Sequence, residues 1–213
     1  MFLAKWNKNA IAKPIPMTVK ELYDLLANPD FQDHFTGDLF FKAYMYMYKP
    51  EEEYKMREEI LGIKKRLKRP NNFIDVFVID IFQLFQDFLK DKKFGKTPML
   101  DFLLNAEQSD SKKVKQSLER ETANPKFYEF VDQEIQSHRN SGNTLRKSYV
   151  FVHGFGQIYP YLRTSKFISR FEKFITDYKI VLFYPGIYKG SFELFGLLND
   201  KNPYRTIKLI NEN

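Results

Sequence analysis

The feature that most constrains the fold is a repeated alternation of short apolar runs with amphipathic helical patterns. The runs at 39–48 and 73–79 each precede a segment with apolar residues at helical spacing, and similar runs return at 149–152 and 179–184. Short runs that alternate with helices predict strands of a mostly parallel sheet. We therefore expect an α/β protein with a Rossmann-like sheet flanked by helices, and an edge strand at 206–210.

The order of these patterns predicts one domain in a chain of 213 residues. Thr18 and Glu21 have the spacing of a capping box and predict an N-terminal helix that ends before Pro29. Three helical stretches without a strand signal follow Pro98 and predict a helical insertion. The expected parts are the N-terminal helix at 18–27, a first β-α-β-α half at 39–91, the helical insertion at 97–139 and a second half at 147–213.

The composition limits the kinds of site that the protein can form and indicates where in the cell it is expected. Cysteine is absent, which excludes disulfides, thiolate metal sites and a cysteine nucleophile. The first residues contain no apolar segment of signal-peptide length, and Asp75, Asp80 and Asp87 interrupt the most apolar stretch, so we expect a cytoplasmic protein without a membrane partner. Aromatic residues make up 17% of the chain, more than its core requires, and we expect some rings to face a partner.

The formal net charge of +7 raises the question of nucleic-acid binding. Two basic clusters, KKRLKR at 64–69 and KDKKFGK at 90–96, are candidates for contacts with phosphates. Both clusters fall at predicted helix ends, where cations suit the helix dipole, and lysine outnumbers arginine. Solvated helix ends are therefore the preferred interpretation, and a nucleic-acid site stays as the alternative.

The run from Val152 to Gly156 is similar to the strand-end segment whose amides form the oxyanion hole of α/β-hydrolases. A hydrolase also needs a nucleophile elbow downstream and a later histidine. The three histidines are His34, His138 and His153, so no histidine follows this run. The hydrolase interpretation is rejected, and we expect no catalytic residues.

Nucleotide and metal sites also lack support. Gly95, Lys96 and Thr97 imitate the end of a P-loop, but the first glycine of that motif would fall at Lys90. Asp80 resembles a Walker B aspartate, yet an aspartate at this place is more often a helix cap. The sequence thus predicts a sheet like that of P-loop NTPases without a Walker A motif. The spacing of the histidines predicts no metal site, and we expect no cofactor.

Two strand-end loops, 154–160 and 185–196, remain as the candidate binding surface. Ligands of open parallel sheets bind beyond the carboxyl ends of the strands, and tyrosines beside arginines are common interface anchors. The candidate binding residues, for a protein interface or a strand-end crevice, are Gly154, Gly156, Tyr159, Pro160, Arg163, Tyr184, Pro185, Gly186, Tyr188, Gly190, Gly196, Asn202, Tyr204 and Arg205.

The same loops carry a resemblance to a known family. The segment VHGFGQIYPYLRTSKFI at 152–168, together with IVLFYPGIYKGSFELFGLLNDKNPYRTIKLI at 180–210, resembles the BrxB family, a small component of BREX bacteriophage-exclusion systems. The match is strong over the last third of the chain, while the helical middle contributes little. Thr164, Ser165 and Lys166 stand where many members are expected to have a histidine.

This resemblance implies a non-enzymatic accessory protein in an anti-phage defence complex. The partner that it implies first is the PglZ-type phosphatase-like protein, and the second is the BrxC-type ATPase. A basic nucleic-acid-binding subunit of the same system is the alternative function. A degenerate nucleotide-binding protein, suggested only by the parallel sheet and Asp80, is the third.

Overall fold

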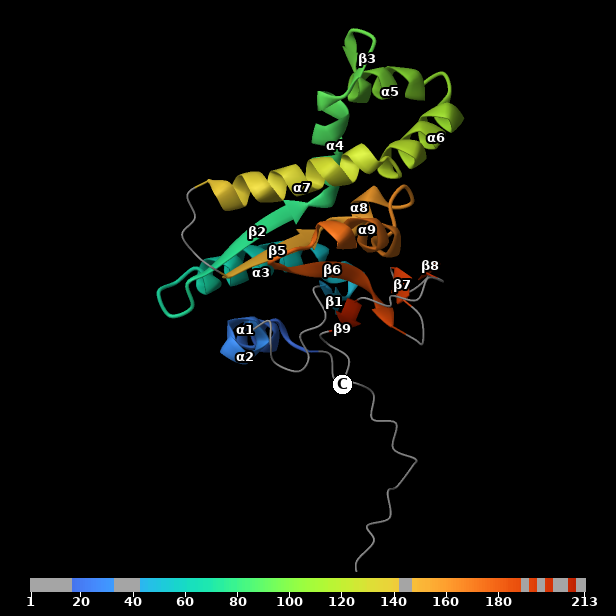
Figure 1. Ribbon diagram of the computed structural model, residues 1–213. Helices are drawn as coiled ribbons and strands as arrows, with labels where there is room; N and C mark the ends of the chain where they lie inside the picture. The colour runs from blue at the N-terminus through green and yellow to red at the C-terminus, as the bar shows by residue number, and fades with distance from the viewer. Residues whose placement is uncertain are drawn as a thin grey trace, which may run out of the picture.

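The protein is an α/β sandwich in which helices cover both faces of a central sheet (Figure 1). The computed structural model describes residues 17–32, 43–141 and 147–188, together with the backbone of 192–194, 198–200 and 207–209; among these, side chains are described up to Gly186, except that of Lys147. This arrangement confirms the predicted α/β fold class with a Rossmann-like parallel sheet. Among the described residues, no helix is long and apolar enough to cross a membrane.

The central sheet has the strand order β2-β5-β6-β1-β9, and all of these neighbours run parallel. The five strands are β1 (Ala43–Tyr48), β2 (Ile74–Asp80), β5 (Lys147–His153), β6 (Lys179–Tyr188) and β9 (Ile207–Leu209). Two short strands, β7 (Phe192–Leu194) and β8 (Leu198–Asp200), continue from β6 as an antiparallel ribbon. The predicted edge strand is confirmed, because β9 lies at the edge beside β1.

The strands bury side chains on both faces, which explains their nearly continuous apolar runs. In β1, Tyr44, Tyr46 and Tyr48 point to one face, while Ala43 and Met45 point to the other. Helices α1 (Val19–Ala27) and α3 (Glu53–Leu67) pack on the tyrosine face. We call this the α3 face, and the opposite side, covered by the remaining long helices, the α7 face.

The α7 face carries the helical segment between β2 and β5 (Figure 1). Helix α4 (Ile81–Asp91) leaves the sheet, and a two-residue strand pair follows it, β3 (Lys93–Phe94) and β4 (Thr97–Pro98). The helices α5 (Met99–Glu107), α6 (Ser111–Thr122) and α7 (Pro125–Asn140) then return the chain to β5. The three helices agree with the sequence pattern, but the strand pair was not predicted because two residues give no periodicity.

Side-chain caps set several of the helix ends. Thr18 and Glu21 form the predicted capping box, and Asp110 and Asn124 cap α6 and α7. Helix α3 follows a 3-10 turn, Pro50–Glu52, and α2 (Pro29–Gln32) begins at the proline that ends α1. Caps and prolines act on the residues next to them, which explains why the sequence predicted these helix ends.

Three boundaries differ from the expectation. The expected loop 154–160 contains a short helix, α8 (Phe155–Ile158), and the expected turn at Pro185 and Gly186 lies inside β6. The strand continues there because Gly186 pairs with Leu194 of β7. The helix expected to follow Arg163 is shorter than predicted: α9 (Thr164–Phe171) ends in a 3-10 turn, Glu172–Phe174.

Candidate functional site at the carboxyl edge of the sheet

Gly154 follows β5 and starts α8, in a left-handed conformation with φ of 88°. A Cβ atom at this position would lie 2.5 Å from Oδ1 of Asp80 and 3.5 Å from the backbone nitrogen of Ile81. Both the positive φ and the close approach require glycine. The glycine that resembles an oxyanion-hole motif therefore has a structural cause.

Asp80 ends β2 and caps α4, as the sequence predicted. Its Oδ1 accepts hydrogen bonds from the backbone N–H groups of Phe82, at 3.0 Å, and Gln83, at 3.2 Å. The carboxylate thus occupies the positive end of this helix, where a phosphate would otherwise bind. The position resembles that of a Walker B aspartate, but this side chain serves the helix that follows it.

His153 ends β5 and lies in register with Asp80 on the neighbouring strand. Its Nδ1 atom is 3.9 Å from Oδ2 of Asp80, is buried, and makes no hydrogen bond. Burial lowers the pKa of His153 below its usual value, although the negative charge of Asp80 opposes this effect. The imidazole is therefore neutral at neutral pH.

A second polar group lies nearby on the α3 face, where Tyr48, Glu53 and Arg57 meet. The Tyr48 hydroxyl donates to Oε2 of Glu53, while Nε and Nη2 of Arg57 donate to Oε1 at 3.2 and 3.0 Å. Burial and the hydrogen bond with Glu53 raise the pKa of Tyr48, so the phenol stays protonated. Each of these polar atoms is satisfied by another member of the group.

We call Tyr48, Glu53, Arg57, Asp80 and His153 the carboxyl-edge cluster. The sequence predicted neither the approach of His153 to Asp80 nor the contacts of Glu53 with Tyr48 and Arg57. A signal was present: Tyr48, Asp80 and His153 each end a strand. It could not be used without the strand order, which puts β2 beside β5.

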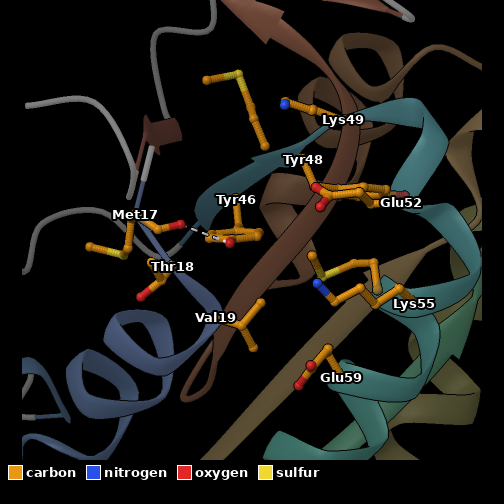
Figure 2. A pocket seen from close by; sticks show the side chains of 11 residues that line it. Met17, Thr18, Val19, Tyr46, Tyr48, Lys49, Glu52, Lys55 and Glu59 are labelled. Atoms are coloured by element: carbon orange, nitrogen blue, oxygen red, sulfur yellow. Dashed lines mark hydrogen bonds between the residues drawn. The ribbon is translucent and has the colours of Figure 1, made fainter. Parts of the chain in front are cut away.

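A hollow of about 300 Å³ adjoins this cluster, with Tyr48 in its wall (Figure 2). It lies between the start of α1, strand β1 and the first turns of α3. Met17, Val19 and Met56 supply apolar lining, while Lys49, Glu52, Lys55 and Glu59 bring charges of both signs. The Tyr46 hydroxyl donates to the carbonyl of Met17 at 2.9 Å, and burial raises the pKa of Tyr46 to about 12. This phenol is therefore a neutral hydrogen-bond donor.

The predicted binding residues divide into internal and surface positions. Gly154, Tyr184, Pro185 and Gly186 are buried, and Tyr184 belongs to the core beneath the α7 face. Gly156, Tyr159 and Arg163 are half-buried, and Pro160, joined to Tyr159 by a cis peptide bond, is exposed. The backbone of Tyr188 lies in β6, but its side chain lies outside the described part of the chain, as do Gly190, Gly196, Asn202, Tyr204 and Arg205 entirely.

The structure thus places Tyr184, Pro185 and Gly186, from the start of the second predicted loop, inside the protein. Tyr184 points into the core because strand residues alternate between faces, and the pairing of Gly186 with β7 keeps this segment in the sheet. Among the predicted residues whose side chains are described, Gly156, Tyr159, Pro160 and Arg163 reach solvent. The last three belong to the segment 159–163, between α8 and α9. We call it the α8–α9 segment.

No metal site is evident in the parts of the chain with described side chains, where no three His, Asp or Glu residues are arranged to hold an ion. The first turn after β1 carries Glu51, Glu52 and Glu53, which disfavours an anion there. In open parallel sheets, nucleotides bind beyond the carboxyl ends of the strands. In this protein, carboxylates lie at two of these strand ends: Glu51–Glu53 after β1 and Asp80 at the end of β2.

Comparison with known proteins decides the family. A family model described as BREX protein BrxB matches residues 77–209. This chain belongs to the BrxB family. A relative from Bacillus cereus (strain H3081.97), also described as BREX protein BrxB, is 24% identical over 177 residues, which cover 79% of this chain and 83% of that protein. No solved structure matches the chain.

The match confirms the resemblance to BrxB and extends it. It covers the helical segment between β2 and β5, to which the sequence motifs had given little weight. It also covers Asp80, His153 and Gly154, while Tyr48, Glu53 and Arg57 precede it. The BrxB model therefore includes two of the five residues of the carboxyl-edge cluster.

Proposed function

We propose that this protein is a non-enzymatic adaptor that binds a larger BREX component through the α8–α9 segment. Membership of the BrxB family makes it a component of a BREX phage-exclusion system. The adaptor role and the partner are our proposal. The first partner to test is the PglZ-type phosphatase-like protein, and the second is the BrxC-type ATPase.

The observation that carries this proposal is the surface position of Tyr159, Pro160 and Arg163 within the family match. A half-buried tyrosine has a fixed ring, so it loses little conformational entropy on binding. The half-buried Arg163 offers a planar guanidinium donor to a carboxylate. Tyrosine and arginine are also the residue types that most often dominate interface energies.

The chemistry of the carboxyl edge supports a role without catalysis. The Asp80 carboxylate is engaged by two backbone N–H groups, and Gly154 is fixed by the approach of Asp80. Tyr48 and Arg57 both bind Glu53. These contacts join β2 to α4 and to the end of β5, and they join β1 to α3, which is what structural contacts at a sheet edge would do.

The proposal is tested by co-expressing the protein with a PglZ-type partner and measuring association of the purified proteins. We expect a stable complex that Arg163→Glu weakens by about tenfold or more, because an interface arginine of this kind is worth at least 1.4 kcal/mol. Lys20→Glu is the matched control, since Lys20 is exposed on α1 and the charge change is the same. Circular dichroism of both variants reports whether the fold is intact.

Two results would reject the adaptor proposal. One is the absence of association with both the PglZ-type and the BrxC-type protein at micromolar concentration. The other is an equal loss of binding in Arg163→Glu and Lys20→Glu, which would indicate a general charge effect. Binding of ATP or GTP to the purified protein, measured by calorimetry, would instead favour the nucleotide-binding alternative.

A further inference from the structure

The turn between α3 and β2 holds an aromatic side chain in solvent next to a group of cations. Phe73 is 58% exposed, although burial of a phenylalanine is favourable by about 1.5–3 kcal/mol. The residue also has a positive φ of 49°, which is uncommon and costly for a bulky side chain. The chain therefore maintains an exposed ring in a strained conformation.

Hydrogen bonds and a cation–π contact stabilise the turn that presents Phe73. The backbone N–H groups of Asn72 and Phe73 both donate to the carbonyl of Arg69, at 2.9 and 3.0 Å. The Asn72 side chain donates to the Tyr23 hydroxyl at 3.1 Å and to the carbonyl of Arg66 at 3.3 Å. The Arg66 guanidinium lies 4.3 Å from the centre of the Tyr23 ring. These contacts tie the turn to α1 and hold Phe73 in place before any ligand arrives.

Four cations precede this ring at the end of α3 and in the turn: Lys64, Lys65, Lys68 and Arg69. Lys65, Lys68 and Arg69 are exposed, and none of the four forms an ion pair with another residue whose side chain the structure describes. Lys64 and Lys65 lie one helical turn before Lys68 and Arg69, so the charges follow the end of α3 toward the turn. No carboxylate among the described side chains pairs with this group, whereas Arg57 and Lys90 each pair with one.

We propose that Phe73 and these cations form a binding site for single-stranded nucleic acid, which we call the α3–β2 turn site. Cations along the end of α3 would contact successive phosphates, and the exposed ring of Phe73 would stack on a base. A single strand fits better than a duplex because its bases are free to stack. An acidic protein surface would satisfy the charges but would give no reason for the strained, exposed ring.

The site is distinct from the proposed docking surface. The turn lies at the amino end of β2, whereas the α8–α9 segment follows the carboxyl end of β5, and β2 and β5 run parallel (Figure 1). It also precedes the region that the BrxB model matches. Nucleic-acid binding and partner binding are therefore separable by mutation.

The test is fluorescence anisotropy of a labelled oligothymidine, and of a duplex of equal length, with the full-length protein. We expect the protein to prefer the single strand, and Phe73→Gly to lower the affinity by about tenfold, the loss typical of one stacked base. Glycine adopts the positive φ without strain, so this variant is expected to be at least as stable as the wild type. A loss of binding could then not be attributed to unfolding.

The charge contribution is tested with Lys68→Glu/Arg69→Glu. This variant should bind much more weakly, and its salt dependence should fall by about 0.7 in slope for each lost phosphate contact. The matched control is Lys112→Glu/Lys115→Glu, which changes the net charge equally at two exposed positions of α6. This control should bind as the wild type does.

Several outcomes would overturn the proposal. They are no binding to the single strand at low salt, equal losses in the α3 and α6 charge variants, or unchanged affinity in Phe73→Gly. Equal competition by polyglutamate would also overturn it and would assign the turn to an acidic protein. None of these results bears on the complex that Arg163→Glu tests.

Discussion

At the scale of single residues, the position of the Asp80 side chain requires a glycine at position 154. The Asp80 carboxylate turns toward the first N–H groups of α4 and thereby occupies the space that a side chain at position 154 would need. A glycine in a motif is often taken as a sign of ligand binding. In this protein it reflects the close approach of two neighbouring strand ends.

Gly154→Ala should therefore destabilise the protein. The positive φ alone costs an alanine about 1 kcal/mol or more, and the contact at 2.5 Å adds to this, so we expect a loss of about 2 kcal/mol or more in the free energy of unfolding. Urea unfolding followed by circular dichroism measures the change.

Gly62→Ala is the matched control for this prediction. Gly62 lies within α3 and a Cβ there would meet nothing within 4 Å, so alanine should stabilise the helix by about 0.5–1 kcal/mol. Equal effects of the two substitutions would contradict the structural explanation of Gly154. The double variant Gly154→Ala/Asp80→Ala should be less destabilised than the sum of the single variants, because it removes the clash.

At the scale of the elements, the sequence predicted most helices and strands but not how far some of them extend. Thr18 and Asp80 gave correct helix starts because caps act locally. The predicted end of β6 was wrong because Pro185 and Gly186 usually indicate a turn. In the structure the strand continues through them, since Gly186 pairs with β7. Helix α8 is only one turn long and has no periodic pattern to read.

The end of α4 is joined to α6 by an ion pair that should be important for the helical insertion. Glu121 is 2% exposed, and Lys92 Nζ and Asn124 Nδ2 both donate to its Oε2 atom. Lys92→Met would leave this buried carboxylate without its principal cation. We expect a loss of about 2 kcal/mol, below the effect of a fully buried pair because Lys92 is partly exposed.

Lys90→Met provides the comparison for that prediction. Lys90 pairs with Asp87, and both side chains are exposed, so its replacement should change the stability by no more than about 0.5 kcal/mol. Chemical denaturation of both variants distinguishes the two pairs. If they unfold alike, the Lys92–Glu121 pair does not stabilise the insertion.

At the scale of the whole molecule, the α/β class was predictable but the carboxyl-edge cluster was not. Apolar runs reveal buried strands, whereas their order depends on long-range packing that no local pattern records. That order brings Asp80 beside His153. The alternation of strand residues between the two covered faces places Tyr184 in the core, although its motif suggested a surface role. Among the predicted site residues with described side chains, Gly156, Tyr159, Pro160 and Arg163 lie at the surface.

Stability is expected to differ between the sheet and the outer part of the insertion. Strands β5 and β6 are central and buried on both faces, while α5 and α6 stand away from the sheet (Figure 1). Hydrogen exchange with increasing denaturant should show that amides of α5 and α6 open before those of β5 and β6.

Helix α7 serves as the internal control in that experiment. Its end is attached to β2 by the contact of His138 Nε2 with Asp75 Oδ2, at 2.8 Å, and to Asp177 by Arg139. Its amides should therefore remain protected longer than those of α5 and α6. Simultaneous exchange of all these elements would show that the insertion and the sheet unfold as one unit.

The place of β1 in the sheet also has a consequence for biosynthesis. Strand β1 is made early, yet both of its neighbours, β6 and β9, come from much later parts of the chain. A nascent chain on the ribosome consequently carries Tyr44, Met45 and Tyr46 with no strand to pair with until β6 has emerged. We expect chaperones to bind this early strand during translation, because an unpaired apolar strand is prone to aggregate.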